Sequence, residues 1–497
     1  MCLHIGKIFI LLLIFSFFNI RASEYNEVKN LLNLGLPVLE IITENQEEPT
    51  CEYVDAPKGS MGRSITNATK VPGSVTLYDT EGSVLYQSGD YKKGESGMTI
   101  KIRGNTSAYA DKKPFKIKLQ KKGDMLARGE DRFKDKNWVL LNDRQMFAFL
   151  GFQLSKLLDM DWTPECLYVN VIFNGDFRGI YLLTEAVERN EKCRINVSET
   201  GFIAEHDPYW WNENGEYLVS ESSPSYNYTL KYPEYSEIDL TRLEEIQTFL
   251  IDYEESLHGW NYDNNINLNS FAKWILGHDI LGTSDGGGVN FYLVKYDDRP
   301  ETLIKAGPLW DFDTSERNVH NWSGVRTTVR FKYLFENTNP SFRKHYLEVW
   351  KRFGNRAFDA MLELSASLRD NKDLWKSFDL SQKEDAERWN YQNYSSSYVG
   401  NRAFHWYQSR KKWMNDVLKE SLIPESSIDN LDAEDTLFKT VYDGVIPYFD
   451  GIVYQIYSLD GKIICEGVSK ANVKIPINNS GIYVLKTEGH VQKILIK

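Results

Sequence analysis

Two nearby stretches of the sequence carry polar residues in a fixed order. Residues 281–294 read LGTSDGGGVNFYLV, and residues 307–313 read GPLWDFD. Asp285 and Asn290 are five positions apart with three glycines between them, and Asn290 opens an apolar run that is typical of a strand. Because glycine lets the backbone approach a ligand closely, this pattern predicts a polar site that includes Asp311.

Phosphoryl transfer calls for this set of side chains. The reaction needs a carboxylate near the attacking hydroxyl and hard oxygen ligands for a divalent metal that bridges the phosphates. Protein kinases use a catalytic Asp, an Asn five residues later and a further Asp before a Phe. Asp285, Asn290 and Asp311 reproduce that order and spacing. The competing interpretation is a polar glycine turn, in which Asp and Asn are common residues.

A kinase site also needs basic side chains for the phosphates. Residues 115–119 read FKIKL, and this alternation places Lys116 and Lys118 on one face of a strand. Either lysine can hold the α- and β-phosphates of a nucleotide, and Arg103 can join it. Glu185 is the candidate carboxylate that orients the lysine. For each lysine the competing interpretation is an ordinary solvent-exposed strand face.

The acidic residues also allow a second enzyme class. A metal-dependent hydrolase could use a carboxylate cage made of Asp285, Asp311, Asp313 and Glu185. The sequence contains no HExxH or GxSxG motif and no Cys/His dyad signature to accompany such a cage. His278, on a helical segment at 271–281, is expected to be a packed side chain rather than a ligand.

Composition predicts a folded protein that does not bind nucleic acid. A chain of 497 residues suggests two to four domains, and its 42% hydrophobic and 26% charged residues are ordinary for a soluble protein. The net charge of -12 argues against a general nucleic-acid binder, because phosphate neutralisation needs a basic face. The cysteines after Cys2 show no zinc-site spacing, and a disulfide between Cys166 and Cys193 is left open.

The N-terminus has the layout of a secretory signal peptide. Lys7 precedes an apolar run at residues 8–18, and Arg21, Ala22 and Ser23 follow it. The run is too short for a comfortable membrane span. We therefore expect an exported chain with no transmembrane span once residues 1–23 have been removed.

The remaining sequence alternates between strand and helix patterns. Asp143 is the expected N-cap of a helix with apolar residues recurring between 147 and 158. Asn174-Gly175 is a strong hairpin signal between two strands. Helical patterns fill residues 341–422, with Phe342, Tyr346, Trp350 and Phe353 on one face. The expected strands lie at residues 36–42, 73–78, 115–119, 167–173, 179–184, 291–294, 302–304 and 491–496, with a hairpin turn at 458–462.

Several segments, in order, resemble the CotH kinase family, the spore-coat-type secreted kinases. They read IRGNTS at 102–107, KKPFKIKL at 112–119, WVLLN at 138–142, VIFNGDFRGIYLLTE at 171–185, GFIAE at 201–205, DGGGVNFY at 285–292, WDFD at 310–313 and RAFHWYQSR at 402–410. The resemblance covers roughly residues 36–422.

This resemblance implies an atypical protein-kinase-like fold of the α+β class, with ATP and Mg²⁺ or Mn²⁺ as cofactors. It also implies phosphate transfer to Ser or Thr of secreted or surface proteins. By this resemblance, Asp285 is expected to be the catalytic base, and Asp311, Asn290 and Asp313 are expected to bind the metal. Cofactor binding is expected of Lys118 or Lys116, together with Arg103 and Glu185. The family segment usually reads NWDxxxxNYYLY, whereas residues 283–288 here read TSDGGG. A surface binding protein or adhesin on a catalytically degenerate kinase scaffold is therefore the alternative.

The expected organisation has four parts. They are a signal peptide at 1–23, a kinase-like domain at 24–422, a linker at 423–440 and a small β-sandwich at 441–497. The kinase-like domain divides into a strand-rich part at 24–119, a catalytic core at 120–340 and a helical part at 341–422. The segments IYSLDGK at 456–462 and GIYVL at 481–485 resemble a C-terminal sorting domain of Bacteroidetes-type secretion. An ordinary accessory β-domain is the competing interpretation.

Overall fold

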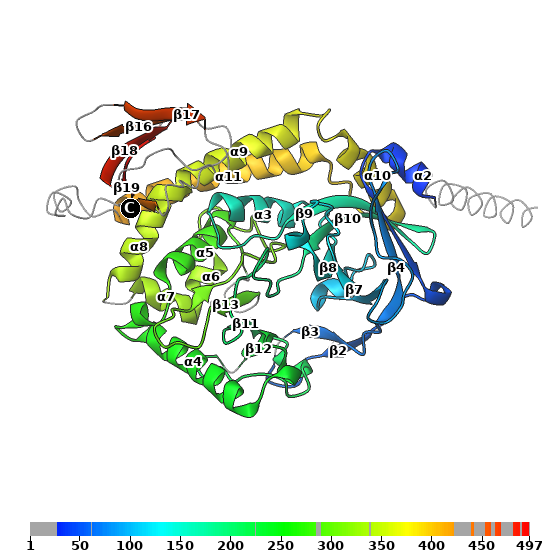
Figure 1. Cartoon of the computed structure of the whole chain (residues 1–497), viewed down its shortest axis with the longest axis horizontal. Coiled ribbons are helices and arrows are strands. Elements are labelled where there is room, and N and C mark those ends of the chain that lie inside the picture. The colour runs from blue at the N-terminus through cyan, green and yellow to red at the C-terminus, as the bar shows by residue number, and fades with distance from the viewer. Residues whose placement is uncertain are drawn as a thin grey trace, which may run out of the picture. The chain divides into compact units, whose positions relative to one another are not determined.

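The chain divides into two compact units, residues 1–417 and 418–497 (Figure 1). The structure is a computed structural model. It describes residues 27–60, 62–223, 225–284, 290–336 and 339–421, and the strands at 439–441, 453–458, 463–468, 481–487 and 490–496. Among the helices in these ranges, none combines the length and the apolar character needed to cross a membrane.

The first unit begins with a sheet that closes on itself. Its strand order is β1-β9-β10-β8-β7-β6-β4-β5, and β1 also pairs with β4, so seven strands form a closed barrel. Closure leaves no unpaired edge among these seven strands. The strands are β1 (Val38–Thr43), β4 (Val71–Tyr78), β5 (Val84–Gln87), β6 (Met98–Ile102), β7 (Phe115–Gly123), β8 (Asp135–Leu141), β9 (Cys166–Phe173) and β10 (Asp176–Glu185). This confirms the strand-rich N-terminal part, whereas the closure was not predicted.

Alternation along the strands separates the two faces of the barrel. Apolar side chains such as Ile117, Trp138 and Leu183 are buried in one core cluster inside the barrel. On β6 and β7 the intervening residues are polar, and most are lysines: Thr99 pairs with Lys118, and Lys101 pairs with Lys116 in the antiparallel register. These lysines therefore lie on the outer face.

Local sequence signals place the hairpin and the first long helix as expected. Asn174 and Gly175 both have positive φ, 50° and 76°, and join β9 to β10. Helix α3 spans Phe147–Leu157. The Asp143 carboxylate accepts hydrogen bonds of 3.0 Å from the backbone amides of Ala148 and Phe149, although Met146 occupies the N-cap position.

A second sheet carries the polar motif. Its order is β12-β11-β13-β14, with β11 at Phe202–Asp207, β12 at Asn227–Tyr232, β13 at Phe291–Lys295 and β14 at Lys305–Ala306. The predicted strand at 302–304 is wrong. Thr302 donates its hydroxyl to the Asp297 carboxylate in the hairpin loop, and Ile304 makes only an isolated bridge with Ile266. The ladder therefore starts at Lys305.

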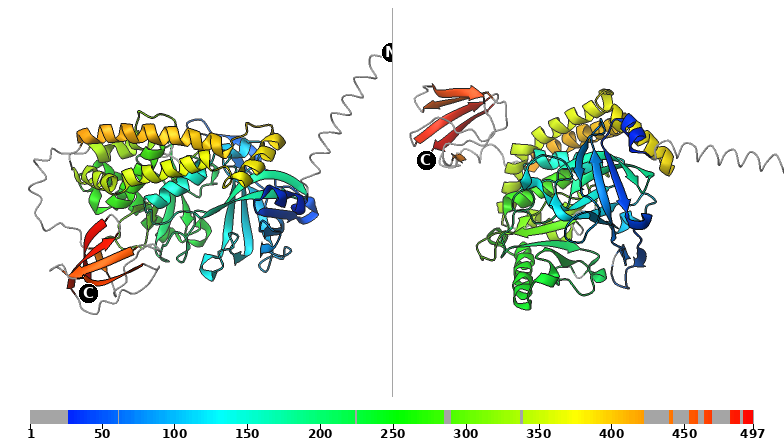
Figure 2. Two further views of the ribbon diagram at one scale, coloured as in Figure 1. Left: turned by 90° about the horizontal axis from the view of Figure 1, so that it is seen from above. Right: turned by 45° about the vertical axis from the view of Figure 1, so that its right-hand side comes forward.

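Helices surround this sheet and cover the barrel. They are α4 (Leu240–His258), α5 (Leu268–Leu281), α6 (Gly324–Thr327), α7 (Val329–Glu336), α8 (Ser341–Val349), α9 (Asn355–Asp370), α10 (Lys376–Trp389) and α11 (Ser396–Ser421). The helices α9 and α11 run side by side (Figures 1 and 2). They approach so closely at Gly400 that a Cβ there would lie 2.4 Å from the backbone nitrogen of Arg369. The predicted aromatic face, Phe342, Tyr346, Trp350 and Phe353, is buried. This confirms the helical C-terminal half of the unit.

The second unit contains one described sheet. Its order is β15-β19-β18-β16-β17, from Lys439–Val441, His490–Ile496, Gly481–Thr487, Val453–Ser458 and Ile463–Val468. The β16–β17 pair is antiparallel, and the turn predicted at 458–462 lies outside the described residues except for Ser458, which ends β16. The sandwich and the sorting-domain resemblance stay predictions. In the first unit, Cys166 and Cys193 are free thiols.

Candidate functional site

The β13–β14 hairpin brings Asn290 and Asp311 together. Asn290 immediately precedes β13, Asp311 follows β14 by five residues, and the Gly307 amide donates to the Tyr292 carbonyl to extend the ladder. The Asn290 Nδ2 donates a hydrogen bond of 2.8 Å to the Asp311 Oδ2. Both side chains therefore meet at one end of the hairpin. Asp285 lies outside the described residues.

A buried aromatic side chain anchors the loop that carries Asp311. Asp311 and Asp313 are exposed, whereas Phe312 between them is 2% exposed. Phe312 meets Phe152 of α3 edge to face, with ring centroids 5.5 Å apart. A Cβ on Gly151 would lie 2.4 Å from the Phe312 ring, so only glycine leaves room for this contact. The packing of Phe312 on α3 thus turns the neighbouring Asp311 outward.

The barrel contributes Arg103 to the same place. Arg103 follows β6, and its Cζ lies 5.9 Å from the ring centroid of Trp310, next to Asp311. The phenol of Tyr292 lies close enough to Arg103 and Asp311 for their charges to shift its pKa. Burial raises the pKa of this phenol well above the usual range, Glu205 and Asp311 raise it further, and Arg103 lowers it. The structure therefore brings Arg103 to the vicinity of Trp310 and Tyr292, next to Asp311.

Two residues of the neighbouring strands complete this charge cluster. Glu205 on β11 is the register partner of Tyr292, and the Lys231 Nζ on β12 lies 2.5 Å from the Glu205 Oε2. Sequence reasoning assigned no role to Tyr292, Glu205 or Lys231. The available signals were the GFIAE segment that contains Glu205 and the position of Tyr292 two residues after Asn290.

The lysines of the barrel face differ in their surroundings. Lys101 lies two residues before Arg103 on β6 and pairs with Lys116 of β7. Lys118 pairs with Thr99, two residues further from Arg103, and is exposed. Burial lowers the pKa of Lys101, and the positive charge of Lys116 lowers it further. Lys116 and Lys101 therefore lie nearer to Arg103 along the strands than Lys118 does.

Glu185 does not orient these lysines in the structure. It is fully buried at the end of β10 and accepts a hydrogen bond of 2.9 Å from the Arg128 Nη1. The register pairs Glu185 with Trp138 on the inner face, whereas Lys116 pairs with Val139 on the outer face. The Lys116 Nζ instead lies 3.0 Å from the Glu188 Oε1. Glu188 therefore takes the place expected of Glu185.

Asp313 belongs to the lining of another cavity. This cavity has a volume of about 490 Å³ and is bordered by the loop after Asp311 and by α11. Among the described residues, no group of three or more His, Cys, Asp or Glu side chains lies close enough together to hold a metal ion. His278 is a packed side chain, as expected, with its Nδ1 2.7 Å from the Thr283 Oγ1.

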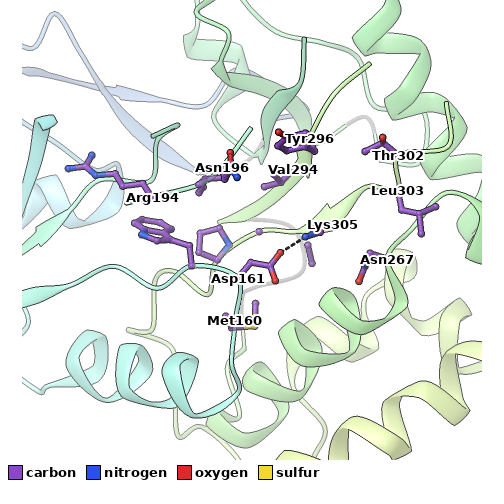
Figure 3. A pocket seen from close by; sticks show the side chains of 15 residues that line it. Met160, Asp161, Arg194, Asn196, Asn267, Val294, Tyr296, Thr302, Leu303 and Lys305 are labelled. Carbon is purple, nitrogen blue, oxygen red and sulfur yellow. Dashed lines mark hydrogen bonds and ion pairs between the residues drawn. The ribbon is translucent and has the colours of Figure 1, made fainter. Parts of the chain in front are cut away.

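A larger cavity lies beside the hairpin (Figure 3). It has a volume of about 570 Å³ and is lined by Val294 and Tyr296, which alternate with Tyr292 along the chain and so share its face of the sheet. Its lining also includes Gly307 and Pro308. Figure 3 shows the Lys305 ammonium joined to the Asp161 carboxylate within this cavity, at 2.5 Å. The cavity thus borders both strands that lead to Asn290 and Asp311.

Comparison with known proteins supports the family suggested by the motifs. A model of the CotH kinase protein family matches residues 100–414, which is more than half of the chain. The match includes the barrel strands from β6 onward, the β13–β14 hairpin and most of α11. A comparison with curated proteins found no match. The chain therefore belongs to the CotH kinase protein family.

Proposed function

We propose that this chain is an ATP- and metal-dependent kinase that transfers phosphate to Ser or Thr of secreted or surface proteins. Its family suggests a kinase-like function. The observation that carries the proposal is the hydrogen bond between Asn290 and Asp311 at the end of one hairpin, with Arg103 beside it. Export rests on the signal-peptide layout of residues 1–23.

The donor set fits a divalent metal that a nucleotide helps to hold. Asp311 presents an exposed carboxylate, and the amide of Asn290 fixes its orientation. Mg²⁺ is commonly bound through one or two carboxylates plus substrate phosphates, rather than by a cage of protein ligands alone. Such a metal, when bound, would neutralise charge that develops on the phosphates. Asp311 would hold it, with the Asn290 carbonyl oxygen and Asp313 as further candidates.

Basic residues of the barrel face would hold the phosphates. Arg103 lies beside Trp310 and can donate in a fork to two phosphate oxygens. Lys116 and its register partner Lys101 follow along the same face. Glu188 would orient Lys116, the task first expected of Glu185. In this proposal Arg103, next to Trp310, would be the cation nearest to Asp311.

The cavity of about 570 Å³ offers room for the base and sugar of the nucleotide. Ligand pockets of this kind commonly measure about 300–1,000 Å³ and combine apolar walls with a few polar groups. Val294, Ala306 and Pro308 supply apolar surface, and Asn196 supplies an amide. Gly307 and Pro308 of the lining lead directly to Asp311.

Asp285 is the proposed base for the acceptor hydroxyl. By its place in the sequence, five residues before Asn290, it corresponds to the aspartate that accepts the hydroxyl proton in protein kinases. Asp285→Asn should therefore abolish transfer while the protein still binds the metal-nucleotide.

Incubation of the purified mature chain with labelled ATP and casein-like acceptors, in Mg²⁺ and in Mn²⁺, tests the proposal. Transfer to the acceptor or to the chain itself should exceed that of an Asp311→Ala control. Equal labelling of the two proteins would overturn it. Phosphate release without labelling would indicate the hydrolase instead.

Ligand-induced stabilisation separates a kinase from an adhesin on the same scaffold. A ligand at a hundredfold its Kd should stabilise the fold by about 2.7 kcal/mol. We expect such a shift of the unfolding midpoint with ATP and metal together. A chain that shows no shift, and that binds a surface partner equally well after Asp285→Asn, would be an adhesin.

A further inference from the structure

Three side chains on one face of α11 contact two segments next to the candidate site, the end of α5 and the loop that follows Asp311. Arg402, Trp406 and Arg410 are spaced by four residues and therefore lie one above another along the helix. We call these three residues the α11 face. Arg410 is fully buried and Trp406 is 6% exposed. None of the three is a candidate ligand for the nucleotide or the metal.

The two loops concerned are already joined through their backbones. One loop, residues 281–284, ends α5 and leads to Asp285. The other, residues 314–324, follows Asp311. The Glu316 amide donates to the Leu281 carbonyl at 2.8 Å, and the Gly324 amide donates to the Thr283 carbonyl at 2.7 Å. A shift of either loop therefore displaces the other.

Arg410 bonds to the last turn of α5 and to the loop after Asp311 at once. Its Nε donates to the Asp279 carbonyl at 2.7 Å, in the last turn of α5. Its Nη1 donates to the carbonyls of Val319 and Asn321 at 2.7 and 2.6 Å, in the loop after Asp311. One planar guanidinium thus fixes the distance between the two chain segments.

Trp406 and Arg402 extend the same contact. The Trp406 Nε1 donates to the Ile280 carbonyl at 3.1 Å. Gly282, two residues later, has φ 61°, and a Cβ there would lie 2.5 Å from the Trp406 ring, so the loop packs closely against the indole. The Arg402 Nε donates to the Glu316 Oε2 at 2.8 Å, and its Nη2 donates to the Gln145 carbonyl just before α3.

A buried guanidinium bonded to carbonyls is a costly way to gain stability alone. Apolar residues of similar volume often replace buried ionic groups without loss of stability. A rigid donor that bonds to several carbonyls of two loops is, in contrast, well suited to fixing their geometry. A displacement of about 1 Å in a catalytic group can cost roughly a hundredfold in rate.

We propose that the α11 face positions residues 279–284, at the end of α5, relative to residues 314–324, which follow Asp311, so that this helix acts as a positioning element of the candidate site. The proposal rests on the kinase function proposed above. Arg402 and Trp406 also line the cavity of about 490 Å³ that Asp313 borders, but the proposed role of all three residues is exerted through the contacted segments and not as ligands.

The buried ion pair between Lys112 and Asp385 provides a matched control. Both side chains are fully buried, and the pair ties α10 to the barrel, where Asp385 also accepts from the Ile180 amide. The atoms of this pair make none of the contacts to residues 279–284 or 314–324 described above. Asp385→Asn should therefore lower stability without changing the site.

Kinetics of Arg410→Met, Arg410→Lys, Trp406→Phe and Asp385→Asn test the proposal, at a temperature at which each protein is fully folded. Arg410→Met should lower kcat per folded molecule about tenfold to a hundredfold. Trp406→Phe, which loses the indole donor and the part of the ring that packs on Gly282, should lower kcat less, and Arg410→Lys should restore part of it. Asp385→Asn should keep the kcat of the parent. Parent-level kcat in Arg410→Met and Trp406→Phe would overturn the proposal.

Amide hydrogen exchange gives a readout that does not depend on activity. Protection of residues 279–284 and 314–321 should fall in Trp406→Phe and in Arg410→Met and stay unchanged in Asp385→Asn. If the parent chain shows no transfer but the exchange pattern holds, the kinase function fails while the contact of α11 with both loops stands. Unchanged protection in both α11 variants would reject the positioning itself.

Discussion

Asn290 and Asp311 are joined by a hydrogen bond of 2.8 Å, and both residues have a left-handed backbone, with φ of 55° and 62°. Left-handed backbone is unfavourable for most residues, by about 1–2 kcal/mol, whereas Asn and Asp tolerate it better. The β13–β14 hairpin, the packing of Phe312 and the bond itself all hold this arrangement. The sequence thus uses two residue types that serve both the backbone and the chemistry.

Substitutions of Asn290 separate these two contributions. Asn290→Gly keeps the left-handed backbone and removes the amide, so kcat should fall about tenfold to a hundredfold with stability changed by less than about 1 kcal/mol. Asn290→Ala removes the same amide and adds strain of about 1 kcal/mol or more. Urea unfolding and steady-state kinetics of both variants measure the two effects. Equal stability of the two variants would argue against the strained backbone, and undiminished kcat in the Gly variant would argue against a role for the amide.

The two lysines of β7 should differ in their effect on nucleotide binding. Lys116 lies beside Lys101, and its ammonium is 3.0 Å from the Glu188 carboxylate. Lys118 lies two residues later on β7 and is exposed. A charge-assisted hydrogen bond contributes about 1.5–3 kcal/mol, so Lys116→Ala should raise the KM for ATP about tenfold or more. Lys118→Ala is the matched control and should change KM less than about twofold. The reverse ranking would restore Lys118 as the phosphate-binding lysine.

Local patterns were sufficient to predict most elements of the first unit. The alternation at residues 115–119, the Asn174-Gly175 turn and the aromatic face from Phe342 to Phe353 each produced the expected element. Closure of the barrel depends on the pairing of β1 with both β4 and β9, which are distant in sequence. Such non-local pairing leaves no periodic signal in the strands themselves.

The contact between Asn290 and Asp311 was readable from the sequence, whereas the partners of Glu185 and Lys116 were not. Asn290 and Asp311 flank the two strands of one hairpin and meet at its open end. The face of Glu185 depends on the register between β10 and β8, and that register places it inside the barrel with Arg128. A single sequence does not contain the register between separate strands, so Glu188 was missed as the partner of Lys116.

His278 should make stability depend on pH. Burial lowers the pKa of its imidazole to about 3, from an ordinary value near 6.5. The folded chain therefore keeps His278 neutral, whereas the unfolded chain takes up a proton as the pH falls below about 6.5. Its contribution to stability is complete above that pH and is lost as the pH falls towards 3, by up to about 1.4 kcal/mol per pH unit.

The comparison of the parent with His278→Gln isolates this contribution. Burial raises the pKa values of Asp143 and Asp207 to about 6, so these carboxyls oppose His278 over the same range, but they are common to both proteins. Urea unfolding at pH 7, 6, 5 and 4 should show the difference in unfolding free energy shrinking as the pH falls. A difference that is constant with pH would mean that His278 titrates normally in the folded chain.

Filling the cavity beside the hairpin should weaken nucleotide binding. Val294 is 7% exposed and lines the cavity of about 570 Å³, so an indole at this position would occupy the space proposed for the base and sugar. Val294→Trp should raise the KM for ATP about tenfold or more, because one or two kcal/mol of contact is lost. Overpacking costs about 1–3 kcal/mol of stability, so the kinetics are measured well below the unfolding midpoint. Val84→Trp, at a position that is 54% exposed on β5, is the control and should leave KM unchanged.

Adenosine alone should inhibit the parent competitively with ATP and inhibit Val294→Trp less. If KM and adenosine inhibition are both unaffected in Val294→Trp, the base binds elsewhere, and only the phosphate and metal positions of the proposal stand.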